Sequence, residues 1–426
     1  MKRYEKYKPS GIEWIGEIPV HWTLATVGRV SNLGRGRVIS SIEIGENPGE
    51  FPVYSSQTEN NGVMGYLNSF NFDGEYVTWT TDGANAGTVF FRKGKFNCTN
   101  VCGTIQPKYW EQIDLRFIPY LLNLGTKYSV RLDINPKLMN NMMAKIPIVV
   151  PPKEEQITIA TYLDRKTAQI DDLIDKKEKL IDVLNEEKTA VINQAMTKGL
   201  NPNTPMKDSG IPWLGEIPAH WEVKKLKYLA SKVGSGITPL GGAAVYQKSG
   251  VPLLRSQNIH FDGLMLDDVA YISEEIDEEM SNSRIAEGDV LLNITGASVG
   301  RCYFVDGALL RGNVNQHVCI IRPIISRIKT IYLYYLLRSY MGQRQIVYLT
   351  SGANREGLNF EQIKAFTFGI PDLEEQIKTI AFLQKETEKI GNVQAKIGRE
   401  IELLQEYRTA LISEAVTGKI DVRGVN

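Results

Sequence analysis

The chain has 426 residues, of which 42% are hydrophobic and 9% aromatic, so its composition is that of a folded protein with about two to four structural units. Its 49 lysines and arginines equal its 49 aspartates and glutamates in number, which excludes nucleic-acid binding through overall positive charge. Four cysteines are too few for a disulfide scaffold, and no apolar run is long enough for a signal peptide or a membrane span. We therefore expect a cytoplasmic protein with no membrane partner.

The first element in the chain, residues 8–22, occurs a second time at residues 207–221. The first copy is Lys-Pro-Ser-Gly-Ile-Glu-Trp-Ile-Gly-Glu-Ile-Pro-Val-His-Trp, and the second is Lys-Asp-Ser-Gly-Ile-Pro-Trp-Leu-Gly-Glu-Ile-Pro-Ala-His-Trp. Eleven of the 15 positions are identical, at an offset of 199 residues, which indicates an internal duplication. We expect Trp14 and Trp213 to anchor the two copies on the ends of helices.

A first variable segment, residues 23–150, follows the first copy. Aromatic and β-branched runs such as Tyr76–Thr80 stand between Gly, Asn and Asp residues, which is typical of short strands joined by turns. A helical patch is predicted near residues 115–127. The segment is therefore expected to be mixed but strand-rich, with a curled antiparallel sheet.

A long helix is predicted over residues 153–200. A pair of prolines precedes it, Glu154 and Glu155 place negative charge at its positive end, and Gly199 marks its end. Inside it, hydrophobic residues recur at spacings of three and four, with polar interruptions at two lysines, which indicates a heptad pattern. The heptad positions are Leu163, Thr167, Ile170, Ile174, Lys177, Ile181, Leu184, Lys188, Val191 and Ala195.

A second variable segment, residues 222–370, and a second long helix, residues 371–426, follow the second copy. Runs such as Asp289–Ile294 predict strands, and a helical patch is expected near residues 329–348. The second helix repeats the first at an offset of 220 residues without a gap, and Gly418 marks its end. Its heptad positions are Leu383, Thr387, Ile390, Gln394, Ile397, Ile401, Leu404, Arg408, Leu411 and Ala415.

This order of elements predicts an α+β fold in which a fixed frame carries two variable, strand-rich domains. The two helices are expected to pair antiparallel as a coiled coil, because each exposed apolar stripe needs a partner. A pseudo-twofold axis would then relate the two halves. The first copy of the repeated element would pack beside the end of the second helix, giving a circular arrangement. The predicted parts are residues 1–152 (first domain), 153–200 (first helix), 201–370 (second domain) and 371–426 (second helix).

Two different domains in twofold relation suit a DNA duplex with two unlike half-sites, because a duplex has its own dyad. Side chains with paired donors and acceptors are the candidates for base recognition. In the first segment they are Arg35, Arg37, Tyr54, Ser55, Gln57, Asn60, Asn61 and Arg131. In the second segment they are Arg255, Gln257, Asn258, His260, Asn354 and Arg355. Such residues are also ordinary in turns, and arginines can contact phosphates only.

The duplicated Ser-Gly-Ile-x-Trp-(Ile/Leu)-Gly-Glu-Ile-Pro-x-His-Trp element, the two Glu-Glu-Gln helix starts and the two divergent inserts resemble the specificity subunit of a type I restriction–modification system. The resemblance covers essentially the whole chain. It implies two target-recognition domains, each recognising one half of a bipartite double-stranded DNA site. It also implies that the helices dock two methyltransferase (modification) subunits, with restriction subunits added for cleavage. S-adenosylmethionine, ATP and Mg²⁺ would then be bound by those partner subunits and not by this chain.

Catalytic and metal sites are not expected in this chain. The sequence contains neither an amino-methyltransferase motif of the Asn/Asp-Pro-Pro-aromatic type nor a Gly-x4-Gly-Lys-Ser/Thr phosphate loop. Cys98 and Cys102 have no second pair or nearby histidine in the sequence, so a zinc site is not expected. His21 and His220 are expected to be packed structural residues, because they recur in matching contexts.

Two alternatives remain open at this point. One is a coiled-coil scaffold whose inserts bind protein or RNA without sequence preference. The other is the specificity half of an enzyme whose catalytic domain is lost or lies on another chain. Recognition of two short DNA blocks around a fixed gap would distinguish a specificity subunit from the scaffold.

Overall fold

The computed structural model describes residues 2–130, 135–211, 213–307, 309, 311–350 and 357–424. The chain divides into two compact units: the first is Met1–Glu178 with Gly398–Asn426, and the second is Lys179–Ile397. Each unit contains one half of each long helix, α5 (Lys153–Lys198) and α10 (Leu373–Val416). Among the described residues, the structure has no helix that is both long and apolar enough to cross a membrane. It also has no cluster of three or more His, Cys, Asp or Glu side chains suited to a metal ion.

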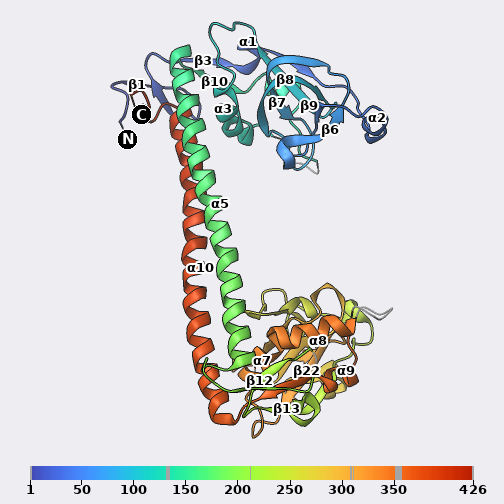
Figure 1. Ribbon diagram of the computed structural model, residues 1–426. Coiled ribbons are helices and arrows are strands. Elements are labelled where there is room, and N and C mark those ends of the chain that lie inside the picture. The colour runs from blue at the N-terminus through green and yellow to red at the C-terminus, as the bar shows by residue number, and fades with distance from the viewer. Residues whose placement is uncertain are drawn as a thin grey trace. The chain divides into compact units, whose positions relative to one another are not determined.

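The first unit is built around a six-stranded sheet of order β4-β9-β7-β8-β5-β6 (Figure 1). Its strands are β4 (Ser31–Arg35), β5 (Phe51–Tyr54), β6 (Val63–Leu67), β7 (Phe72–Thr80), β8 (Val89–Cys98) and β9 (Cys102–Pro107). The short helices are α1 (Val27–Val30), α2 (Ser41–Glu46), α3 (Phe117–Gly125), α4 (Asn140–Met143), η1 (Glu59–Gly62) and η2 (Thr126–Tyr128). Two separate antiparallel pairs are β1 (Tyr7–Pro9) with β2 (Glu17–Pro19), and β3 (Thr23–Thr26) with β10 (Pro147–Val150).

The second unit has a four-stranded sheet, β14-β22-β19-β20, and a three-stranded sheet, β18-β15-β21. Their strands are β14 (Ala230–Ser235), β15 (Val251–Leu254), β18 (Ala270–Ile272), β19 (Val290–Asn293), β20 (Cys302–Phe304), β21 (Asn313–Val314) and β22 (Val318–Pro323). Three further pairs are β11 (Met206–Asp208) with β12 (Glu216–Pro218), β13 (Glu222–Lys225) with β23 (Thr367–Ile370), and β16 (Ile259–His260) with β17 (Gly263–Leu264). The short helices are α6 (Glu274–Glu279), α7 (Thr330–Arg338), α8 (Tyr340–Thr350), α9 (Phe360–Ala365), η3 (Leu226–Tyr228), η4 (Gly242–Val245), η5 (Ser256–Asn258), η6 (Ser281–Ser283) and η7 (Gly296–Ser298).

The prediction of mixed, strand-rich segments is confirmed, but one detail of it was wrong. The sheets are not wholly antiparallel, because β5 pairs with β8, and β15 with β21, in parallel. Long connections between these strands let the chain return in the same direction, and a hydrophobic pattern does not report which strands become neighbours. The helical patch predicted near residues 329–348 is confirmed, and it consists of two helices because the backbone is extended at Ser339.

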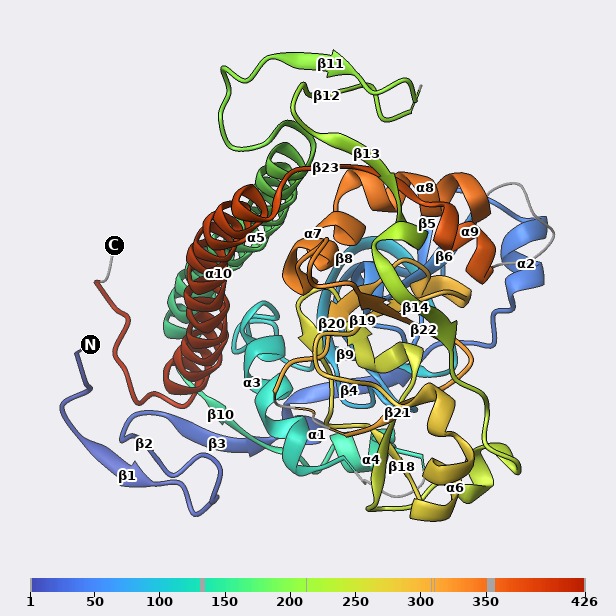
Figure 2. The same cartoon turned by 90° about the horizontal axis from the view of Figure 1, so that it is seen from below.

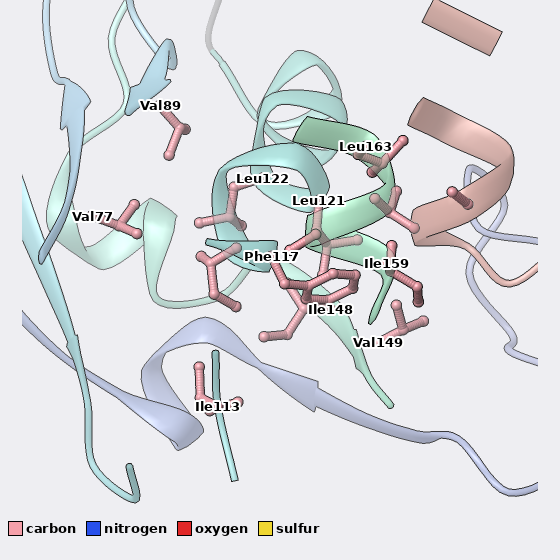
Figure 3. Packing of buried hydrophobic residues seen from close by; sticks show 14 of the residues in the cluster. Val77, Val89, Ile113, Phe117, Leu121, Leu122, Ile148, Val149, Ile159 and Leu163 are labelled. Atoms are coloured by element: carbon pink, nitrogen blue, oxygen red, sulfur yellow. The ribbon is translucent and has the colours of Figure 1, made fainter. Parts of the chain in front are cut away.

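The core of the first unit lies where α3 meets the start of α5. Phe117, Leu121 and Leu122 of α3 lie together with Ile159 and Leu163 of α5, and strand β10 adds further apolar side chains (Figure 3). This face of α5 is therefore committed to packing against the variable segment of its own unit. Burial of side chains of this size contributes about 1.5–3 kcal/mol each.

Within each unit, the parts of the two long helices lie side by side (Figures 1 and 2). In the first unit, Asp171 pairs with Arg408 at 2.8 Å and Lys177 pairs with Glu400, so partner numbers fall as α5 advances. In the second unit, Gln394 donates a hydrogen bond of 2.8 Å to the side chain of Asn185. The pairing within each unit is therefore antiparallel.

The heptad positions predicted from the sequence are all buried or half-buried, including the polar ones. Lys177, Gln394 and Arg408 find partners on the opposite helix. Lys188 instead forms a 2.6 Å ion pair with Asp262 of the second variable segment. Polar residues in a coiled-coil core fix register at some expense in stability, so these contacts define how the helices align.

Candidate nucleic-acid interface

The start of each long helix is tied to a copy of the repeated element through one glutamate. Glu155, in the first turn of α5, accepts hydrogen bonds from the Trp22 indole at 2.9 Å and the Tyr4 hydroxyl at 3.2 Å. Its other oxygen lies 2.7 Å from His21 Nε2 and 3.3 Å from Arg423, which follows α10. Burial, together with the carboxylate of Glu155, raises the pKa of Tyr4 well above its ordinary value.

The same arrangement recurs in the second unit. Glu375, in the first turn of α10, accepts a 3.1 Å hydrogen bond from the Trp221 indole and lies 2.6 Å from His220 Nε2. These contacts fit the predicted structural role of both histidines, but the side chains of His21 and His220 are 39% and 51% exposed, so the prediction that they are packed was wrong. The recurrence also explains why the His-Trp pair and the Glu-Glu-Gln helix start are repeated together, because the histidine and the tryptophan both contact the second glutamate of the helix start.

The glutamine that follows each of these glutamates connects the helix to the variable segment through main-chain atoms. Gln156 accepts from the Asp114 amide at 2.9 Å and donates to the Gln112 carbonyl at 2.8 Å. Gln376 accepts from the Lys329 amide at 2.9 Å and donates to the Arg327 carbonyl at 3.2 Å. Because the partners are backbone groups, the joint does not depend on the side chains of the variable segment.

The expectation that Trp14 and Trp213 anchor the repeated element on helix ends was wrong for Trp14, whereas Trp213 lines a cavity with Thr197 and Lys198 at the end of α5. Trp14 stacks on Tyr128 of η2, with ring centroids 5.7 Å apart and planes at 13°. The carbonyl of Trp213 lies 3.5 Å from an Arg344 nitrogen of α8. Both tryptophans therefore contact the variable segment of their own unit.

The expectation that the first copy of the repeated element packs beside the end of the second helix is confirmed within the first unit. The Tyr7 hydroxyl donates to the Gly418 carbonyl at 3.1 Å, and the Asp421 amide donates to the Lys2 carbonyl at 2.9 Å. Gly418 has φ +73°, and a side chain there would press on Pro19 and Trp22. A glycine is therefore required where α10 ends against the repeated element.

Three segments of the first variable segment converge at one end of its sheet. Strand β4 ends in Gly34-Arg35-Gly36, β5 ends at Tyr54, and β8 ends before Thr99. The Thr99 amide donates to the Tyr54 carbonyl at 2.8 Å, and the Arg37 amide donates to the Cys98 carbonyl at 3.1 Å. The predicted polar stretch after Tyr54 therefore lies beside the Arg35–Arg37 segment.

The second variable segment repeats this geometry with other side chains. Strand β14 ends in Gly234-Ser235-Gly236, β15 ends at Leu254, and the amide of Asn315 donates to the Leu254 carbonyl at 3.1 Å. Thr238 donates a hydrogen bond to Gln316. The sequence-based expectation that the stretch after Leu254 occupies a place comparable to that after Tyr54 is consistent with this arrangement.

The structure places the candidate residues of the first segment in different environments. Arg37 is held by Glu43 in a bidentate ion pair, with one bond of 3.0 Å. Arg35 donates a hydrogen bond to the Asn100 carbonyl and lies 3.8 Å from Asp82. Asn60 and Asn61 are exposed and adopt left-handed backbone conformations, at φ 47° and 53°. The side chain of Ser55 accepts from the Gln57 amide, and the Gln57 side chain donates to the Val63 carbonyl.

The candidates of the second segment cluster around Asp268. Arg255 lies 3.7 Å from its carboxylate, and Gln257 donates to it at 2.7 Å. His260 Nε2 lies 2.9 Å from the Gln257 carbonyl. Asn258 is 1% exposed, and its amide group is hydrogen-bonded to main-chain atoms of the same loop, so the structure gives it a structural role. Arg131, Asn354 and Arg355 lie outside the described residues.

Sequence analysis missed Arg92, which lies under the stretch after Tyr54. Arg92 is 3% exposed, and its guanidinium lies 3.6 Å from the centroid of the Tyr54 ring and 4.3 Å from that of Phe90. Burial lowers its pKa, and its Nε donates to the Thr78 hydroxyl at 3.2 Å. The sequence did not mark Arg92 as a functional candidate. The alternation of side chains along β8 predicts only which face of the sheet Arg92 occupies. Asn100 in the first unit and the Asn315–His317 turn in the second unit were also missed, since each reaches the convergent strand ends of its own unit only through strand pairing.

Exposed aliphatic residues on the two long helices form a second surface feature. Ile157, Leu173 and Leu403 are exposed in the first unit, and Ile377, Val393 and Val183 are exposed in the second. The offset of 220 residues that relates the helices matches these residues in three pairs. Each unit therefore carries one copy of the same apolar set, outside the heptad positions.

Known proteins that resemble this chain belong to one family. A family model described as the type I restriction modification DNA specificity domain matches residues 19–183 and 218–403. A Mycoplasma pneumoniae protein, described as the N-terminus of a type I specificity subunit, is 48% identical over 136 residues, which is 32% of this chain and 72% of that protein. For six further Mycoplasma pneumoniae relatives, the match covers between 37% and 61% of their length.

Two matches span nearly the whole chain. The specificity subunit of a type I restriction enzyme from Methanocaldococcus jannaschii is 24% identical over 424 residues, covering 96% of this chain and 95% of that subunit. A solved chain from work on assembly and conformational transition of the type I R-M system has a TM-score of 0.71 at 14% identity. That match covers 95% of this chain and 99% of the solved chain, and it shows a shared fold.

Proposed function

This chain belongs to the type I restriction–modification DNA specificity family, and from that premise we propose that each of its two variable segments recognises one half of a bipartite, asymmetric DNA site. The observation that supports this most directly is the repeated convergence of three strand ends, with Arg35, Asn60 and Asn61 in one unit and Arg255 and Gln257 in the other. The frame is the same and the side chains differ, so the two half-sites should differ. Methylation and cleavage are proposed to reside on partner subunits, which would bind S-adenosylmethionine, ATP and Mg²⁺.

The test of this function is sequencing of methylated adenines in DNA from cells that express the chain with its modification subunits. We expect two short specified blocks separated by a fixed unspecified gap. The scaffold alternative predicts that the complex has equal affinity for every duplex. Uniform affinity with the modification subunits present would therefore reject sequence recognition.

The paired helices are proposed to set the length of the gap. Inserting one heptad into α5 after Glu178 and one into α10 after Ile397 keeps every heptad position in phase. Seven residues lengthen a helix by about 10.5 Å, which corresponds to about three base pairs of DNA. We expect the gap in the methylated site to grow by about three base pairs while both blocks keep their sequences. A heptad in only one helix is the control, because it should disrupt the pairing, and a change in block sequence would contradict the proposal.

The two apolar sets on the helices are proposed to dock two copies of one modification subunit. An apolar set that is present once in each unit suits two identical partners. Leu173→Asp and Val393→Asp each place a charge in one set, and each should reduce the number of bound modification subunits from two to one, as measured by native mass spectrometry of the complex. Gln405→Glu is the control, since it adds a charge at an exposed position of α10 outside the sets. Two bound subunits in both variants would contradict this docking surface.

A further inference from the structure

The segment that follows each Gly-x-Gly strand end presents two exposed aliphatic side chains. In the first unit these are Val38 and Ile42, which are 72% and 71% exposed. In the second unit they are Ile237 and Leu240, which are 57% and 94% exposed. Single exposed apolar residues are common, but a pair at the equivalent place in two divergent segments indicates a shared use.

The backbone holds both pairs in place. A side chain on Gly36 would overlap the carbonyl oxygen of Cys98, and one on Gly236 would overlap that of Val314, so each strand end passes directly against its neighbour. Beyond the glycine, Ser40 caps α2 by accepting from the Glu43 amide at 3.1 Å. The exposed fractions of the aliphatic side chains show that they face solvent and do not fold back onto the core.

Both pairs lie next to polar side chains at the convergent strand ends. Val38 follows Arg37 directly, and its carbonyl accepts a 3.1 Å hydrogen bond from the Arg37 guanidinium. In the second unit, Thr238 lies between Ile237 and Leu240 and is bonded to Gln316. The aliphatic groups and the polar groups would therefore meet the same part of a bound duplex.

We propose that these aliphatic pairs contact the C5-methyl groups of thymines in the major groove, one pair in each half-site. This inference rests on the proposed function, because it needs DNA bound at the convergent strand ends. The thymine methyl is the apolar feature that base pairs present in the major groove, and it distinguishes T·A from the other pairs there. Arginine, asparagine and glutamine beside it would supply the hydrogen bonds, and the aliphatic pair would supply the apolar contact.

The experiment replaces thymine by uracil in one half-site at a time and measures binding by the complete complex with its modification subunits. Uracil removes only the methyl group, so the wild-type complex should bind about three- to fivefold more weakly, as expected for one buried methyl. Leu240→Ser should weaken binding to the thymine duplex by a similar factor and should be insensitive to uracil in the second half-site. Ile42→Ser should behave in the same way for the first half-site only.

Ile325→Ser is the matched control, since Ile325 is 50% exposed in the second unit and lies outside these segments. It should keep the wild-type response to uracil. Binding by Leu240→Ser equal to wild type, or an unchanged response of that variant to uracil, would overturn the inference. In the second of these outcomes, Leu240→Ser weakens binding to the thymine and uracil duplexes by the same factor. That result would indicate that the side chain inserts between bases. A wild-type complex that prefers its site but ignores uracil defeats only this inference, whereas absence of any preference defeats the proposed function.

Discussion

Replacing residues 23–150 with the corresponding segment of another family member should change one block of the methylated site and leave the other block and the gap unaltered. The exchanged segment includes both strands of the β3–β10 pair, so the strand pairing that joins its two ends is retained. Its joint to α5 uses the main-chain atoms that Gln156 contacts, and these are present whatever side chains the new segment carries. Methylated-adenine sequencing measures the result.

The reciprocal exchange of residues 222–370 is the control, because it should change the other block only. Its closing pair, β13–β23, and its joint to Gln376 are built in the same way. Alteration of both blocks by either exchange would contradict independent recognition by the two units. A chimera that loses all methylation while still binding its modification subunits would contradict the main-chain joint.

Glu155→Ala should destabilise the first unit by about 3 kcal/mol, because it leaves the buried indole of Trp22 without an acceptor and removes the carboxylate that His21 and Arg423 share. Thermal unfolding of the full chain, followed by tryptophan fluorescence, measures the shift. Glu154→Ala is the matched control, since Glu154 is exposed one residue earlier in the same helix turn. Its effect should stay within about 0.5 kcal/mol.

The corresponding change in the second unit should have a smaller effect. Glu375 is more exposed than Glu155, and it has no counterpart to the contacts with Tyr4 and Arg423 among the described residues. Glu375→Ala should therefore cost about 1–2 kcal/mol. Equal losses at the two positions would show that the additional contacts of Glu155 contribute nothing measurable.

The two long helices and the repeated element were predictable because the sequence patterns that mark them are local or occur twice. Heptad spacing is a property of one helix, so the predicted positions from Leu163 to Ala195 and from Leu383 to Ala415 are those that the structure buries. The first residue of α5, Lys153, also agrees with the sequence. Because the repeated element is duplicated, the contact between its tryptophan and the helix-start glutamate occurs in both units.

The candidate recognition residues were predictable only as stretches. The sequence pointed to the segments after Tyr54 and Leu254, and strand pairing places each beside a Gly-x-Gly strand end. The sequence did not indicate that Glu43 forms an ion pair with Arg37. It also did not indicate that the side chain of Asn258 is hydrogen-bonded within its own loop. Such pairings depend on the path of the chain after each turn, and amino-acid composition does not encode that path.

Amino-acid sequence by itself therefore determined the duplication, the two long helices with their heptad positions, and the family to which the chain belongs. Tertiary structure alone decided which strands became neighbours, that Trp14 packs on Tyr128, and that Arg92 lies beneath the Tyr54 ring. The physical reason is separation along the chain: helical periodicity is written within a few residues, whereas strand neighbours and buried charges are set by contacts between distant segments.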